Sequence, residues 1–329
     1  MGFDYPVGST LKAPFPLSWV TNKHLQLFKV PLPFGGYWFP YGAVPDNWSV
    51  EQLAAFLEQY SPKPVVVRGW TTEAMPIVRR RGWCCWQVGV EGRKPLTHAS
   101  GYPKKTRHAI RKGYQNAEYF QWPDATQLPS AFFQLLQGTT IAHRPQLQWL
   151  FRNPPDPAIR LYVAASHSTW FAAIGISTNH KGWVQAEWMA RHGNAPYGVL
   201  DALVHFALQK ERQAGNSIFS FGEVPFVQVK NLQWTAQLII RTSAFGLQGV
   251  YNYSGLFFFK NKYVTQWHPI FLCGYPNLTA QQIAGIAWKS RALQLWQQGL
   301  NYQLKNATQH FITNSFIPYV TALLPFLPH

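Results

Sequence analysis

Two lysines separated by one residue stand inside an aromatic segment of the C-terminal third. Lys260 and Lys262 belong to the run YNYSGLFFFKNKYVTQWHP, which spans residues 251–269. No Asp or Glu follows Glu223, so this part of the chain holds cations and no acids. Because aromatic neighbours oppose free solvation of two ammonium groups, we expect the lysines to bind a phosphate group. Ordinary solvated lysines are the structural alternative.

The charge of the chain indicates an anionic partner. The 329 residues carry a formal net charge of +16 at pH 7, with 29 Lys and Arg against 13 Asp and Glu. Nucleic acid and an anionic bilayer surface both suit such a protein, while a general aid to solubility is the alternative. The length is sufficient for two domains of ordinary size.

The chain shows no signal for membrane insertion or secretion. No apolar run reaches about 18 residues, and the N-terminus lacks a charged region followed by an apolar core. The cysteines are Cys84, Cys85 and Cys273, an odd number with no metal-ligand spacing and two neighbours too close to bridge easily. We therefore expect reduced thiols and a cytoplasmic protein, peripheral on the inner face of the membrane.

The first 102 residues predict one α/β domain. Residues 1–45 are rich in Pro, Gly and aromatic residues and indicate an irregular wrap with short strands. Ser49 and Gln52 form the pattern of a capping box for a helix. The expected elements are a helix over 50–60, a buried strand over 64–68, a helix over 71–81 and a strand over 83–90.

Residues 103–118 predict a basic helix that starts at a proline. Its cations recur at i, i+3, i+4 and i+7, so they share one face and repel one another. The repulsion between these cations would be offset if the helix bound an anion between two domains. A solvated surface helix is the alternative. The residues concerned are Lys104, Arg107, His108 and Arg111, with Lys105 and Lys112 beside them.

Residues 119–278 predict a second α/β unit, followed by a tail over 279–329. The tail is helical to about residue 305, and its apolar, proline-broken end either packs on the body or lies in a bilayer interface. The helix–strands–helix–strand order of the second unit is that of an N-acetyltransferase fold. Its elements are helices over 130–137 and 146–152, strands over 159–166, 170–177 and 183–190, an amphipathic helix over 197–214, and a strand over 217–222.

Three motifs together carry a family resemblance. They are the aromatic–lysine segment 251–269, NAPYGVLD at 194–201 at the start of the amphipathic helix, and FSFG at 219–222. Over roughly residues 60–271 the chain resembles the phosphatidylglycerol lysyltransferase C-terminal domain, the soluble catalytic part of the multiple peptide resistance factors. The resemblance implies an α/β protein with two tandem N-acetyltransferase-like (GNAT) domains joined by the basic helix.

The resemblance also implies aminoacyl transfer from aminoacyl-tRNA to a membrane lipid such as phosphatidylglycerol. The reaction requires a base or positioning group for the lipid hydroxyl, donors for the developing oxyanion and a basic surface for RNA. It requires no metal and no redox cofactor. The catalytic candidates are Glu187, Asp201 and His268. The substrate-binding candidates are Lys260, Lys262, Trp267, Arg241, Asn252 and Glu223. The tRNA-binding candidates are Lys104, Arg107, His108, Arg111 and Lys112.

Some of these residues have structural alternatives. Glu187 lies among apolar strand residues and suits a paired structural acid as well as a catalyst. Asp201 stands in a first helical turn, where the helix dipole favours any carboxylate. His205, four residues later, suits packing better than catalysis. We expect Glu187, Asp201, Lys260, Lys262 and Trp267 to line one cavity, with His268 at its rim.

The chain departs from the family at one motif. The family pattern Trp-Glu-Pro-Arg-Tyr is Trp-His-Pro-Ile-Phe here, so His268 and Ile270 replace a Glu and an Arg. The donor amino acid therefore stays open, and so does activity itself. No phosphate-binding glycine loop is present, and residues 191–195 do not match an acyl-CoA loop. The rival functions are acyl or aminoacyl transfer to a peptide or small amine, and a non-catalytic RNA- or membrane-binding module.

Overall fold

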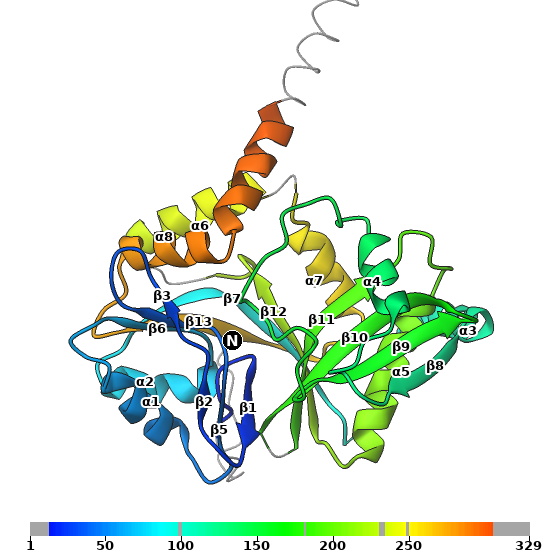
Figure 1. Cartoon of the computed structure of the whole chain (residues 1–329), viewed down its shortest axis with the longest axis horizontal. Helices are drawn as coiled ribbons and strands as arrows, with labels where there is room; N and C mark the ends of the chain where they lie inside the picture. Colours follow the sequence, from blue (N-terminus) through cyan, green and yellow to red (C-terminus); the bar gives the residue numbers. More distant parts are fainter. Residues whose placement is uncertain (1–12, 98–100, 181, 230–233, 248–249, 305–329) are drawn as a thin grey trace, which may run out of the picture.

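The structure is a computed structural model that describes residues 13–97, 101–180, 182–229, 234–247 and 250–304. Figure 1 shows a mixed α/β fold built on one long twisted sheet with helices on both sides. Ten strands form this sheet in the order β3-β4-β6-β13-β7-β12-β11-β10-β9-β8, and β1, β5 and β2 form a small second sheet. The division into two tandem units stays a prediction.

The N-terminal elements confirm the predicted helix and strand order. The Ser49 side chain accepts from the backbone N–H of Gln52, and the Gln52 side chain accepts from the backbone N–H of Ser49. This capping box starts α1. The elements are β1 Trp19–Asn22, β2 Gln26–Leu27, β3 Val30–Pro31, β4 Tyr37–Phe39, β5 Gly42–Pro45, α1 Val50–Glu58, β6 Val65–Thr71, the short 3-10 helix η1 Thr72–Ala74, α2 Met75–Arg80 and β7 Cys84–Pro95.

The middle of the chain follows the predicted order with two differences: the strand β8 was not predicted, and the helix predicted over 146–152 does not form. Residues 146–152 are irregular and not helical, in a loop that continues into the proline-rich run 153–157. The elements are α3 Lys104–Asn116, β8 Glu118–Trp122, α4 Ser130–Gln137, β9 Arg160–Ser166, β10 Thr169–His180, β11 Trp183–Arg191, α5 Val199–Gln213 and β12 Ile218–Pro225.

The C-terminal third returns to the first half of the sheet. It contains α6 Trp234–Leu247, α7 Tyr253–Asn261, β13 Gln266–Tyr275 and α8 Ala280–Lys289, and a further helix covers 292–304. β13 lies between β6 and β7 and pairs antiparallel with both. α6, α7 and β13 were not predicted from the sequence. Residues 305–329, with the proline-broken end of the tail, lie outside the described residues.

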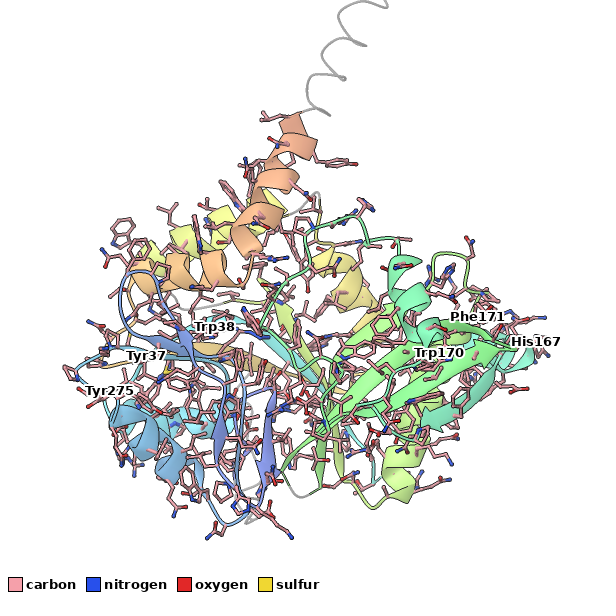
Figure 2. The ribbon with its side chains drawn as sticks, viewed as in Figure 1. Tyr37, Trp38, His167, Trp170, Phe171 and Tyr275 are labelled. Atoms are coloured by element: carbon pink, nitrogen blue, oxygen red, sulfur yellow. A yellow bond between two sulfur atoms is a disulfide. The ribbon has the colours of Figure 1, made fainter. Side chains whose placement is uncertain are left out.

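Alternate residues of the central strands serve two cores, because successive strand side chains point to opposite faces. In β6, Val65 and Val67 pack with α1 and α2, while Val66 packs with α8. In β10, Ile174 packs with α5 and Ala173 with α4. Figure 2 marks aromatic residues at both ends of the sheet, including Trp38 and Trp170. Helices therefore cover both faces of the sheet.

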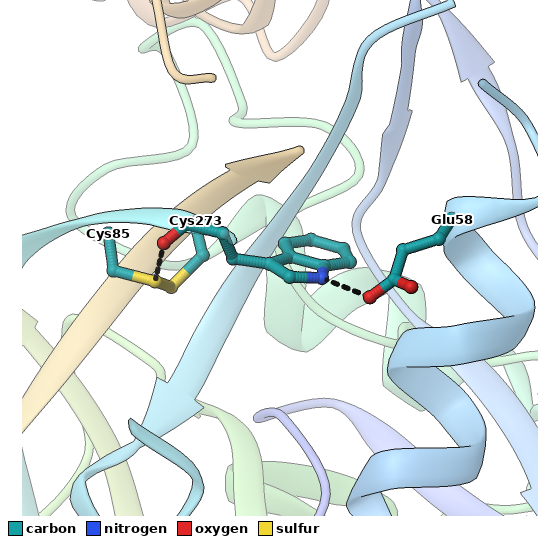
Figure 3. The surroundings of a disulfide bond; sticks show 4 residues. Glu58, Cys85 and Cys273 are labelled. Atoms are coloured by element: carbon teal, nitrogen blue, oxygen red, sulfur yellow. Dashed lines mark hydrogen bonds between the residues drawn. A yellow bond between two sulfur atoms is a disulfide. The ribbon is translucent and has the colours of Figure 1, made fainter. Parts of the chain in front are cut away.

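The cysteine expectation was wrong for two of the three residues. The register of β13 on β7 places Cys273 opposite Cys85, and the two form a disulfide across the strands (Figure 3). Beside it, the Trp83 indole N–H donates to Glu58 at 2.9 Å. Cys84 is the remaining free thiol. This pairing depends on the register of strands whose cysteines are 188 residues apart, so no local pattern around Cys84 and Cys85 indicates it.

None of the helices in the described residues is long and apolar enough to cross a bilayer. The same part of the chain contains no group of three or more His, Cys, Asp or Glu side chains arranged to hold a metal ion.

Candidate active site

Two parallel strands stop pairing in the middle of the sheet. β11 and β12 pair from Trp183 with Ile218 to Gln185 with Ser220, and both strands then continue without further pairing to each other. β12 also shifts its register against β7 between Ser220 and Glu223. Within this irregularity Gly222 adopts a φ of +70°, a conformation that favours glycine. The end of strand pairing leaves room for a side chain from another element.

Lys260 occupies the space beside Gly222. A Cβ atom on Gly222 would lie 4.0 Å from the Lys260 Nζ and 3.1 Å from the Ala186 carbonyl oxygen. Lys260 stands in the last turn of α7, which begins where the Asn252 side chain accepts from Gly255 at 2.7 Å. Its Nζ donates to the Glu223 carbonyl oxygen at 3.0 Å. The amine is thus buried at the point where β11 and β12 separate.

Two further groups complete what we call the Lys260 cluster, which consists of Lys260, Glu223, Arg68 and Tyr251. The Glu223 carboxylate lies 3.0 Å from the Arg68 guanidinium, and burial and the charge of Glu223 raise the pKa of Tyr251 to about 12. Burial lowers the pKa of Lys260 to about 7, although the charge of Glu223 opposes this. Near neutral pH the amine can therefore both accept and release a proton.

Lys262 has a different environment from Lys260. Its Nζ lies 2.9 Å from Asp201 Oδ1, and the Lys262 side chain is 38% exposed. Tyr263 also donates to Asp201, and burial raises the pKa of its hydroxyl. Asp201 lies in the first turn of α5, which follows Gly198 at a φ of +83°. The structure thus brings Asp201 and Lys262 together, with a cation that remains accessible to a ligand.

Glu187 is fully engaged by its neighbours. Its carboxylate accepts from Ser18 at 2.7 Å, from Ser177 at 2.5 Å and from Gln185 at 2.6 Å, and from the backbone N–H of Arg152 at 3.3 Å. The residue is only 3% exposed. These contacts favour the structural alternative, in which Glu187 holds the segment around Ser18 against the sheet.

His268 lies on β13 opposite Glu91 of β7. Burial, reinforced by the charge of Arg93, lowers the pKa of its imidazole. Arg93 binds Glu91 at 2.7 Å and Glu73 at 2.6 Å. Although burial opposes it, Arg93 lowers the pKa of Glu73 to about 2. His268 therefore borders an ion cluster that already contains two carboxylates.

Two substrate-binding candidates remain, Trp267 and Arg241. Trp267 stacks on Phe257 with ring centroids 4.5 Å apart, and its indole N–H donates to Asn261 at 3.0 Å. Arg241 is exposed on α6. Among the described side chains, no hydrogen bond or ion pair joins Glu187 to Lys260 or Lys262. The printed contacts thus pair Asp201 with Lys262 and Glu223 with Lys260, and one cavity shared with Glu187 stays a prediction.

Sequence reasoning missed Arg68 and Tyr251 in the Lys260 cluster, and Tyr263 beside Asp201. Tyr251 and Tyr263 lay inside the aromatic–lysine segment, where their hydroxyl groups were the available signal. Arg68 ends the otherwise apolar run PVVVR. A single arginine at the end of a buried strand indicates a buried carboxylate partner, because an unpaired buried charge is costly.

A second candidate surface lies on the basic helix α3. All five cations predicted to bind tRNA are exposed, and the opposite face, with Ala109 and Gly113, is buried against α5. The approach is close, because a Cβ on Gly113 would lie 2.2 Å from the Gly198 carbonyl oxygen. Beside α3 an open groove of about 540 Å³ is lined by Tyr102, Arg107, Ile110, Arg111, Tyr114, Gln115 and His205.

Comparison with known proteins confirms the resemblance seen in the motifs. Residues 171–274 match the model of the family described as phosphatidylglycerol lysyltransferase, C-terminal. No curated protein matches the chain. The structure of L-PGS from Bacillus licheniformis is 16% identical, covers 80% of this chain and 84% of its own, and has a TM-score of 0.61.

A second solved structure shows the same fold. It is the C-terminal domain of a putative lysylphosphatidylglycerol synthetase from Agrobacterium fabrum, which is 15% identical, covers 79% of this chain and 83% of its own, and has a TM-score of 0.61. The matched segment 171–274 contains both lysines, Asp201 and Glu223. In that segment the chain therefore resembles the phosphatidylglycerol lysyltransferase C-terminal family, and its mixed α/β fold is that of the solved synthetase domains.

Proposed function

We propose that this protein transfers an aminoacyl group from aminoacyl-tRNA to a hydroxyl group of an anionic membrane lipid such as phosphatidylglycerol. The family match and the likeness to two synthetase structures support a transferase of this class. The observation that carries the proposal is the buried Lys260 amine, with a pKa of about 7, at the point where β11 and β12 stop pairing.

In the proposed step, the lipid hydroxyl enters beside Gly222. The neutral Lys260 amine takes its proton as the hydroxyl oxygen attacks the ester carbonyl carbon of the aminoacyl group. The bond to the terminal ribose oxygen then breaks, and the Lys260 ammonium returns the proton to that oxygen. A base whose pKa lies near the working pH serves both directions of this transfer well. Lys262, partly exposed beside Asp201, is the cation that would contact the lipid phosphate.

The groove on α3 supports the RNA part of the proposal. Arg107 and Arg111 are cations that can bind phosphates, and Tyr102 and Tyr114 offer aromatic faces on which unpaired bases stack. The combination suits the single-stranded end of a tRNA better than a duplex. We propose that α3 and this groove hold the acceptor end while Lys104, His108 and Lys112 extend the basic surface.

The donor amino acid is proposed to be set near His268. Two carboxylates already surround Arg93 beside it, and His268 adds no third negative charge. A donor with a neutral side chain is therefore as suitable as lysine.

The same proposal includes the domain organisation and the location. The chain would consist of two GNAT-like units over 1–102 and 119–278, with the basic helix between them. The protein would lie on the inner face of the membrane as a peripheral protein.

The experiment combines purified protein, a mixture of charged tRNAs and phosphatidylglycerol vesicles, with mass spectrometry of the extracted lipids. We expect a lipid heavier by one aminoacyl group. Lys260→Met should lower its formation about 100-fold, as expected for loss of a general base. Lys210→Met, which removes an exposed lysine of α5, is the matched control and should have no effect.

Three results would contradict the proposal. The first is that no modified lipid forms with any of the charged tRNAs. The second is full activity of Lys260→Met. The third is a product formed on an added peptide or small amine and not on the lipid, which would favour the rival acyl transfer.

A further inference from the structure

The outward face of α6 carries a stripe of three apolar side chains and one cation. We call Trp234, Leu238, Arg241 and Phe245 the α6 stripe, since positions i, i+4, i+7 and i+11 share one side of a helix. Trp234 is 74%, Leu238 58% and Phe245 59% exposed. Ala236 and Leu247 on the inner side are buried. The helix thus has two apolar faces, of which only one packs against the protein.

The last described helix, over 292–304, packs against α6. The Trp296 indole N–H donates to the Thr242 carbonyl at 3.1 Å, and Gln303 donates to the Phe245 carbonyl at 2.6 Å. The backbones approach closely, because a Cβ on Gly299 would lie 1.9 Å from the Gly246 carbonyl oxygen. The stripe therefore stays exposed although α6 contacts a neighbouring helix.

The stripe lies at one end of the molecule with other helices of the C-terminal third. Figure 1 shows α6, α8 and the helix over 292–304 grouped together above the first half of the sheet. Trp288 of α8 is a further exposed aromatic residue, at 68%. Large exposed apolar residues gathered on one region mark a site of interaction with a partner or a membrane.

Charge decides which partner suits this region. No acid follows Glu223, so every charged residue on α6, α7 and α8 is a cation. Aromatic rings with cations suit the headgroup level of an anionic bilayer, where rings insert and cations meet phosphates. A second copy of the chain would instead oppose Arg241 with another Arg241. The charge pattern therefore disfavours self-association through this face.

We propose that the α6 stripe is the face by which the protein docks on an anionic lipid bilayer. Trp234, Leu238 and Phe245 enter the interfacial layer, and Arg241 meets the lipid phosphates. The purpose of docking rests on the proposed function: a protein docked through α6 is held at the membrane that supplies the acceptor. Binding itself does not depend on catalysis.

Vesicle flotation tests the proposal. Wild-type protein should float with vesicles of phosphatidylglycerol and phosphatidylcholine in equal parts, and much less with phosphatidylcholine alone. Leu238→Gln with Phe245→Gln should weaken partition by about tenfold or more, since two apolar side chains are lost from the interface. The matched control is Phe133→Gln with Leu136→Gln on α4, which are also exposed and apolar, and it should bind as wild type.

Charge reversal gives a second test. Arg241→Glu should weaken binding to the anionic vesicles by roughly tenfold. Arg80→Glu makes the same change at an exposed position of α2 and should have a clearly smaller effect. Equal flotation of the wild type and both stripe variants would overturn the proposal. So would sedimentation showing that the stripe variants break up a dimer while vesicle partition stays unchanged.

A soluble acceptor separates docking from catalysis. With a short-chain phosphatidylglycerol below its micelle concentration, Leu238→Gln with Phe245→Gln should retain transfer, while transfer to vesicles should fall with partition. Stripe-dependent flotation without transfer to either acceptor would remove the proposed function and leave docking intact. Transfer to both acceptors with no difference between wild type and the stripe variant would remove docking and leave the function intact.

Discussion

The Nζ atom of Lys262 lies 2.9 Å from Oδ1 of Asp201, and this ion pair joins the end of α7 to the first turn of α5. Two residues earlier, Lys260 contacts the Glu223 backbone carbonyl on β12. Lys262 is therefore paired directly with a carboxylate, while Lys260 is buried and donates to a backbone carbonyl. The two lysines of one short motif are expected to differ in role.

Replacing one partner of the Lys262–Asp201 pair should reveal a moderate coupling. The pair is partly exposed, so a double-mutant cycle with Lys262→Met and Asp201→Asn should give about 0.5–1 kcal/mol in urea unfolding. Lys262→Met should also raise KM for the lipid with little change in kcat, because a phosphate contact acts on binding. A coupling near zero would show that the pair does not form in solution.

The stability of the protein should depend on the titration of Lys260. Its pKa is about 7 in the folded protein and 10.5 for an ordinary lysine. Between these values the unfolded chain binds more protons, so the free energy of unfolding rises with pH. Lys260→Met lacks this group. The free energy of wild type minus that of Lys260→Met should therefore increase from pH 7 to pH 10, by at most about 1.4 kcal/mol per unit.

Urea unfolding of both proteins across this pH range measures the difference, with Lys210→Met as a control whose curve should run parallel to wild type. Parallel curves for wild type and Lys260→Met would mean that Lys260 keeps an ordinary pKa, and the base assigned to it would lose its support.

Glu187→Gln should cost stability and leave the chemistry of folded molecules intact. The substitution turns an acceptor of several buried hydrogen bonds into a group that must also donate, at a cost of about 3 kcal/mol. Glu118→Gln on exposed β8 is the matched control, with no expected loss. A normally stable Glu187→Gln protein with no transfer would instead return Glu187 to a catalytic role.

Arg107→Ala with Arg111→Ala should weaken tRNA binding. A plot of the logarithm of the binding constant against the logarithm of the salt concentration has a slope set by the number of phosphate contacts. Each lost contact lowers the magnitude of this slope by roughly one. Fluorescence titration between about 50 and 200 mM salt measures this. Arg79→Ala with Arg80→Ala on α2 removes two exposed arginines elsewhere and serves as the control. Equal slopes in both double variants would remove α3 from the RNA surface.

His268→Glu should shift the donor toward lysine if His268 sets selectivity. It should also destabilise the protein at pH 7, because a third carboxylate joins Glu91 and Glu73 around Arg93. Those charges raise the pKa of the new carboxyl, so its penalty should shrink as pH falls. His268→Gln is the neutral control. The test uses a mixture of charged tRNAs and measures by mass spectrometry the fraction of the modified lipid that carries lysine. An unchanged fraction in a folded His268→Glu protein would place donor selection elsewhere.

Local signals were enough for several elements and motifs. The capping box of Ser49 and Gln52 involves residues three apart, and the apolar period of α5 repeats within one helix. Short-range patterns of this kind determine helix starts and faces whatever the rest of the fold does. The segment around Lys260 and Lys262 and its family resemblance were likewise readable in the chain.

Only the tertiary structure decided how those residues meet. β13 enters between β6 and β7, and its register brings Cys273 to Cys85 across 188 residues of sequence. Glu187 finds Ser18, 169 residues away. Strand register and burial depend on partners far along the chain, and a shift by one residue would reverse every side chain. The sequence by itself therefore determined the cationic, aromatic character of the Lys260 segment, while packing determined that Lys260 is buried beside Glu223, that Lys262 pairs with Asp201, and that the α6 stripe faces outward.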